Sequence, residues 1–157
     1  MATKDIQAWL DEYGESHQNK TNKAIHWFCV PLIYWTVMAF VWAIPTPAAF
    51  AEVPYLNWAS IISVLVILYY VRLSPSLAIG MTVFTIICFA TVSAVDAAFP
   101  GQLVPIAGTA FVLLWIGQFI GHKIEGKKPS FFKDVQFLMF GPAWLMSFVY
   151  QKMGLKY

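Results

Sequence analysis

Four long apolar stretches, separated by short polar or proline-containing segments, occupy most of this chain. A helix of about 20 apolar residues is long enough to cross the hydrocarbon core of a bilayer, which is roughly 30 Å thick. The composition agrees, because 59% of the residues are hydrophobic and only 11% are charged, whereas soluble proteins have about 45–50% and about 25%. The sequence therefore predicts an all-α integral membrane protein.

The order of the spans follows from the turns between the apolar stretches. We expect membrane spans at about 27–44, 56–71, 77–98 and 103–121. Short connections make neighbouring helices antiparallel, so these spans should form a four-helix bundle. The whole chain, 1–157, then forms a single membrane domain, because little length remains for a separate module.

The polar segment 1–26 precedes the first span. Its apolar residues recur at steps of three and four, which is the period of an amphipathic helix. These residues are Ile6, Trp9, Leu10 and Tyr13. We expect a short amphipathic helix that ends near Gly14 and lies on the membrane surface or over the mouth of the bundle.

The segment 122–157 follows the last expected span. It contains one more apolar stretch, 131–150, which is interrupted by charged residues, a glycine and a proline. We expect this stretch to be interfacial or re-entrant, and a fifth full span is the alternative.

The positions of lysine and arginine give the orientation, because these residues are retained on the cytoplasmic side. With four crossings, all 10 basic residues fall on one side of the membrane. A fifth crossing would send Lys152 and Lys156 to the other side. We therefore expect a multi-pass protein with both termini cytoplasmic, in a bacterial inner membrane or, in a eukaryote, in the endoplasmic reticulum.

The chain has 3 histidines, and each lies where a polar segment meets an apolar one. His26 begins the first span and His122 follows the fourth, so both belong at the cytoplasmic boundary, close to His17. On an unbroken helix His17 and His26 would face opposite ways, because nine residues rotate by about 900°. The sequence 18–22 favours a turn or helix cap that would let them converge. Three neutral imidazoles at one depth can bind a transition metal.

Further polar residues accompany these histidines. Asn22 lies one helical turn before His26, and Gln118, His122 and Glu125 share a face if their helix extends through Glu125. Interfacial histidines also anchor membrane proteins, so a non-enzymatic transporter or lipid-binding scaffold stays an alternative. A haem protein that uses His26 and His122 as axial ligands is a second one.

Two sequence blocks carry a resemblance to a known family. They are Tyr13…His17-Gln-Asn-Lys-Thr-Asn22-Lys-Ala-Ile-His26-Trp-Phe-Cys-Val-Pro31 and Trp115-Ile-Gly-Gln118-Phe-Ile-Gly121-His122-Lys-Ile-Glu125-Gly-Lys-Lys-Pro129. In this order they resemble the membrane-bound 2-hydroxy fatty acid dioxygenase family, which has a yeast endoplasmic-reticulum member in phytosphingosine breakdown and bacterial relatives. The resemblance covers nearly the whole chain in order and hydropathy, but its specific part is these two blocks.

The resemblance implies an oxidoreductase of fatty acid α-oxidation that uses Fe(II) and molecular oxygen to remove one carbon from a long-chain 2-hydroxy fatty acid. His17, His26 and His122 match the family's histidine positions and become the expected metal ligands. Glu125 and Asn22 match polar positions in the same blocks. Glu125 is a further catalytic candidate, either as a ligand in place of one histidine or beside the ligands. Asn22 and Gln118 are candidates to contact the ligands without binding the metal, Gln118 as a hydrogen-bond donor. Membrane lipid, and no nucleic acid, is the other expected partner.

Overall fold

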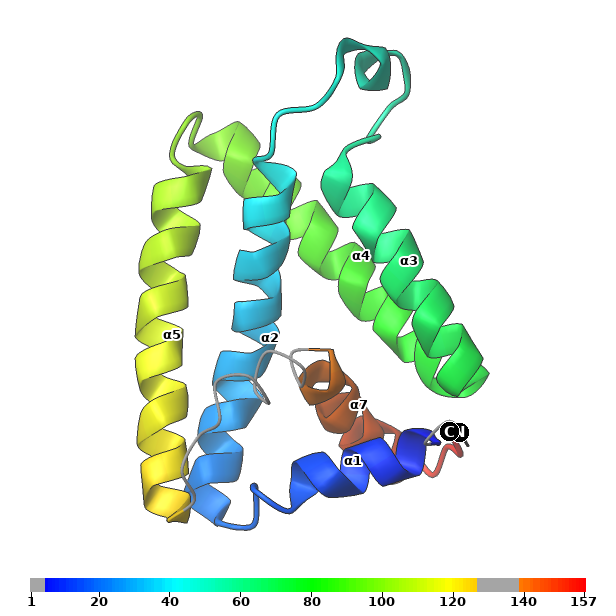
Figure 1. Ribbon diagram of the computed structural model, residues 1–157, viewed down its shortest axis with the longest axis vertical. Coiled ribbons are helices and arrows are strands. Elements are labelled where there is room, and N and C mark those ends of the chain that lie inside the picture. Colours follow the sequence, from blue (N-terminus) through cyan, green and yellow to red (C-terminus); the bar gives the residue numbers. More distant parts are fainter. Residues whose placement is uncertain (1–4, 127–138) are drawn as a thin grey trace.

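The computed structural model describes residues 5–126 and 139–157, which form helices and contain no strand (Figure 1). The elements are α1 (Ile6–Gly14), α2 (Lys20–Trp42), the short helix η1 (Ala48–Glu52), α3 (Trp58–Leu73), α4 (Pro75–Ala98), α5 (Leu103–Glu125) and α7 (Phe140–Lys152). Over this part of the chain the all-α prediction is confirmed.

Three of these helices, α2, α4 and α5, are long and apolar enough to cross a membrane. The second expected span is also helical, but α3 has only 16 residues. At 1.5 Å per residue it is about 24 Å long, which is less than the roughly 30 Å of the hydrocarbon core. The length and composition of the helices therefore support three crossings. The fourth crossing stays a prediction.

The long helices form two pairs. Figure 1 shows α2 and α5 side by side and antiparallel, while α3 and α4 form a second antiparallel pair that leans away from them. Local sequence sets the helix starts: the Asn57 side chain accepts the Ser60 N–H at 2.9 Å at the start of α3. Ser74 caps α4 in the same way at 3.1 Å.

The break that was predicted between His17 and His26 is present, but it lies a few residues earlier than expected. The chain leaves the helix after Gly14 and enters α2 at Lys20. Asn19 is the cap, because its side-chain oxygen accepts the backbone N–H of Thr21 at 2.8 Å. We refer to residues 15–19 as the α1–α2 connection.

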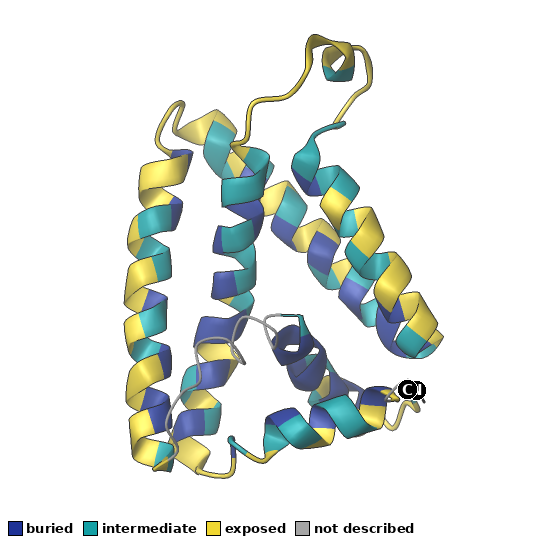
Figure 2. Cartoon of the chain, viewed as in Figure 1, coloured by how far each residue is buried: buried dark blue, intermediate teal, exposed yellow. Residues whose placement is uncertain are grey.

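The C-terminal apolar stretch is described only in part, because 131–138 lie outside the described residues. Its described portion forms α7, which has 13 residues and packs against α1, α2 and α4. Most of α7 is buried (Figure 2). It is too short to be a span by itself, and its placement relative to the membrane stays a prediction.

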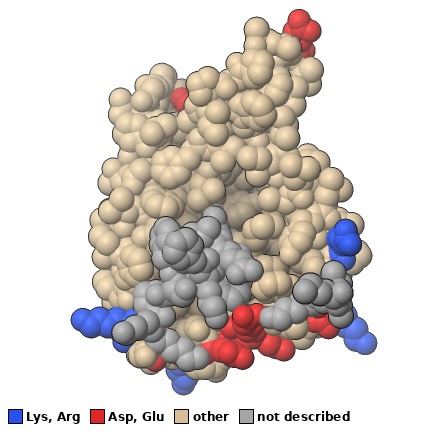
Figure 3. All heavy atoms as spheres, viewed as in Figure 1, with Lys and Arg blue, Asp and Glu red and all other residues tan. Residues whose placement is uncertain are grey.

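The outward faces of the long helices are apolar. Leu65 of α3, Ile86 of α4 and Leu113 of α5 are 60%, 61% and 63% exposed. Exposed positions run along all these helices (Figure 2), and many of them are large apolar residues. On the face drawn in Figure 3, charged side chains gather at the lower end and are nearly absent from the middle. This pattern suits a protein whose middle contacts lipid.

Tyr150 joins α7 to the start of α4. Its hydroxyl donates to the Ser76 carbonyl at 2.7 Å and accepts the Gly80 N–H at 3.1 Å. We expect Tyr150→Phe to lower the free energy of unfolding by about 0.5–1.5 kcal/mol, because it removes these two part-buried hydrogen bonds between α7 and α4. Thermal unfolding in detergent measures this. Tyr55→Phe is the control, since Tyr55 is 74% exposed; equal melting temperatures would contradict the prediction.

Candidate metal centre

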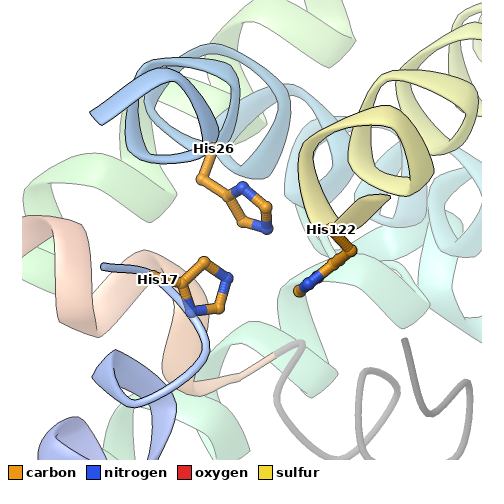
Figure 4. A group of neighbouring side chains, drawn as sticks. All are labelled: His17, His26 and His122. Atoms are coloured by element: carbon orange, nitrogen blue, oxygen red, sulfur yellow. The ribbon is translucent and has the colours of Figure 1, made fainter. Parts of the chain in front are cut away.

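The three histidines meet at the lower end of the molecule, where the α1–α2 connection, the beginning of α2 and the end of α5 come together. Figure 4 shows the three rings facing one another. His17, His26 and His122 are 3%, 1% and 5% exposed. Their ring centroids are separated by 4.2 Å (17 to 26), 5.0 Å (26 to 122) and 5.3 Å (17 to 122). One ligand nitrogen from each lies within 4.8 Å of the others, so the group could hold a metal ion.

Backbone carbonyls set the tautomers of two of these rings. His17 Nδ1 donates to the Tyr13 carbonyl at 2.6 Å, and His26 Nδ1 donates to the Asn22 carbonyl at 2.9 Å. A carbonyl only accepts, so each Nδ1 carries the proton and each Nε2 has a lone pair. Both Nε2 atoms are buried and have no hydrogen-bond partner within the described residues. A histidine that binds a metal usually donates its other ring N–H in this way.

Burial also keeps the His17 ring neutral. It lowers the pKa of the His17 imidazole to about 4, partly against the effect of the Tyr13 carbonyl, which raises it. The ring is therefore uncharged at neutral pH. A neutral imidazole is the form that binds a metal ion.

Asn22 and Glu125 form a polar network beside the rings. The buried Asn22 amide donates to the Ser16 carbonyl at 3.2 Å and to Glu125 Oε2 at 3.0 Å. The Glu125 carboxylate also accepts the backbone N–H groups of Gln18 and Asn19 at 2.8 and 2.9 Å. The structure thus brings Glu125 close to the histidines, with its oxygens directed at the α1–α2 connection and Asn22.

The face of α5 that meets α2 contains two further residues of the site. A Cβ atom at Gly121 would overlap Asn22 Oδ1 and would lie 3.5 Å from His26 Cε1, so the glycine allows the close approach of the two helices. Gln118 is only 6% exposed and lies beside His26. Asn22 and Gln118 therefore both lie at the cluster.

The helix that carries His122 is long enough for Gln118, His122 and Glu125 to share one face. α5 continues through Glu125 and ends at Gly126, which has a φ of 75°. Glycine adopts this left-handed conformation without a steric penalty and commonly ends helices. The condition for placing Gln118, His122 and Glu125 on one face is confirmed.

Two aromatic residues cover the His17 ring. Tyr13 stacks on it with centroids 4.2 Å apart and planes 11° from parallel, and Trp144 of α7 lies 5.3 Å away. Tyr13 belongs to the first sequence block, one turn before His17. Trp144 was not anticipated, because it comes from the distant C-terminal stretch and no spacing connects it to a histidine.

The close ring packing bears on the haem alternative. A haem with two axial histidines needs a porphyrin plane between the two rings. His26 and His122 face each other edge to face with centroids 5.0 Å apart, and His17 is in contact with both. This arrangement leaves no space for a porphyrin between them.

Comparison with family models matches residues 3–153 to the family described as 2-hydroxy-palmitic acid dioxygenase Mpo1-like. No curated protein and no solved structure matches the chain. The matched range contains both histidine blocks and all the helices described above.

Proposed function

The chain belongs to the Mpo1-like family of 2-hydroxy-palmitic acid dioxygenases, and on this premise we propose that it is an iron(II)-dependent dioxygenase of long-chain 2-hydroxy fatty acids. The product would be the fatty acid shorter by one carbon. The observation that supports this most is the buried cluster of three imidazoles, in which the His17 and His26 rings have their Nδ1 atoms held by carbonyls.

We propose that His17, His26 and His122 hold the iron. Three protein ligands on one side of the iron leave its other coordination positions open for substrate and oxygen, as ferrous oxygenases require. Bound iron would supply the redox chemistry with which molecular oxygen cleaves the bond between the carboxyl carbon and the hydroxyl-bearing carbon. The protein would orient the ligands. Hydrogen bonds to backbone carbonyls fix the His17 and His26 rings, and Tyr13 and Trp144 shield the His17 ring from water.

We also propose that the site lies at the cytoplasmic boundary of a four-span, single-domain membrane protein with both termini cytoplasmic. The charged side chains near the histidine end (Figure 3) and the apolar surface of α2 to α5 support this placement. A 2-hydroxy fatty acid suits such a site, because its polar head can reach the histidines while its alkyl chain stays among apolar side chains.

The test is aerobic incubation of the purified protein with Fe(II) and 2-hydroxy-palmitic acid, followed by mass spectrometry. We expect the acid that is one carbon shorter to accumulate. Palmitic acid, which lacks the hydroxyl, and a sample treated with a chelator are the controls and should give no product. If a metal-loaded sample leaves 2-hydroxy acids of several chain lengths intact, the proposed activity is wrong.

A further inference from the structure

The three imidazoles are not held equally. His26 and His122 lie on α2 and α5, whose close contact positions them relative to each other. His17 lies in the α1–α2 connection, outside any helix. A ring on a short connection needs some other constraint to stay against the other two.

Glu125 provides such a constraint. Its Oε1 accepts the N–H of Gln18, the residue after His17, at 2.8 Å, and its Oε2 accepts the N–H of Asn19 at 2.9 Å. These bonds join the last residue of α5 to backbone more than one hundred residues earlier, at separations of 107 and 106. Hydrogen bonds to a carboxylate are stronger than those between neutral groups.

The third bond of this carboxylate connects it to the second histidine. Glu125 Oε2 accepts the Asn22 amide at 3.0 Å, and the Asn22 carbonyl in turn accepts His26 Nδ1–H at 2.9 Å. The carboxylate also lies at the N-terminus of α2, where the helix dipole favours a negative charge. One side chain therefore contacts the backbone beside His17 and the residue that orients His26.

We propose that Glu125 is a positioning residue that holds His17 against the other imidazoles and does not itself bind the metal. To become a ligand, the carboxylate would have to leave two backbone N–H groups and the buried amide of Asn22. The carboxylate would give up three charge-assisted hydrogen bonds, one of them to the fully buried Asn22 side chain. This inference rests on the proposed metal site.

The test is a double-mutant cycle with Co²⁺ as an optical probe of the metal site in detergent-solubilised protein. We expect Glu125→Ala to weaken Co²⁺ binding about 10–100-fold, which is the usual effect of removing a residue that supports a ligand. In a His17→Ala background the same change should weaken binding less than about 2-fold, because Glu125 would act through His17. Glu52→Ala is the matched control, since Glu52 is an exposed carboxylate in η1, and it should leave Co²⁺ affinity unchanged.

The outcomes separate the possible roles of Glu125. Equal losses in both backgrounds would show that Glu125 acts independently of His17, as a ligand or through Asn22, and no loss in Glu125→Ala would leave it without a role; either result overturns the inference. If the wild-type protein binds no Co²⁺, the proposed metal site fails as a whole, and positioning fails with it. If Glu125→Ala does not fold, as judged by circular dichroism and gel filtration, Glu125→Gln allows the same cycle, because it keeps one acceptor oxygen.

Discussion

Replacing His26 or His122 with alanine should abolish metal binding and dioxygenase turnover, with a loss of affinity greater than about 100-fold. Each is one of only three imidazoles in the cluster, and each lies on a helix, so no neighbouring histidine can take its place. The readout is iron content after reconstitution together with product formation.

A second measurement separates lost metal from lost fold. Metal that binds only the folded protein raises its stability, by about 2.7 kcal/mol at a concentration 100 times the dissociation constant. We expect the wild-type protein to gain this stabilisation in thermal unfolding and both variants to lose it. Without metal, the variants should unfold somewhat below the wild-type temperature, because each substitution leaves a cavity in place of a buried ring; the comparison is therefore the shift that added metal produces in each protein.

Thr36→Ala is the matched control for the histidine variants. Thr36 is buried on α2, and its hydroxyl donates to the Ile33 carbonyl within the same helix, at 2.8 Å. It lies ten residues beyond His26, about 15 Å along the helix. This variant should bind metal as the wild type does. A histidine variant that also binds normally would show that the cluster does not hold the metal.

The convergence of the three histidines could be predicted from the sequence because it depends only on the order and direction of the spans. Residues at the start of one span and the end of an antiparallel partner lie at the same level. α2 and α5 are such a pair (Figure 1), and His26 lies near the start of α2 and His122 near the end of α5. For His17, the helical rotation between positions 17 and 26 required a break, and the structure has one.

The parts that sequence reasoning missed depend on tertiary contacts. The spacing placed Glu125 on the same face as His122, but only the folded chain directs the N–H groups of Gln18 and Asn19 at its carboxylate. The break between α1 and α2 lies earlier than predicted because Asn19, and not a later residue, caps α2. Trp144 reaches His17 through the packing of α7, which no local pattern encodes.

Gly121→Ala should damage both the fold and the metal centre. The added Cβ would overlap Oδ1 of the fully buried Asn22. Asn22 cannot move away easily, because its amide is held by the Ser16 carbonyl and by Glu125. Overpacking of this kind costs about 1–3 kcal/mol, which exceeds the roughly 0.5–1 kcal/mol that alanine gains over glycine in a helix. We expect a net loss of stability and weaker Co²⁺ binding.

Gly108→Ala is the control for Gly121→Ala, because both glycines lie on α5. A Cβ atom at Gly108 has nothing within 4 Å, so the substitution changes helix propensity without changing packing. It should stabilise the protein by about 0.5–1 kcal/mol and leave Co²⁺ affinity unchanged. Thermal unfolding and Co²⁺ titration of the two variants in the same detergent measure the difference. If Gly121→Ala matches Gly108→Ala in both, then α2 and α5 can separate without disturbing the histidines, and their close approach does not determine the site.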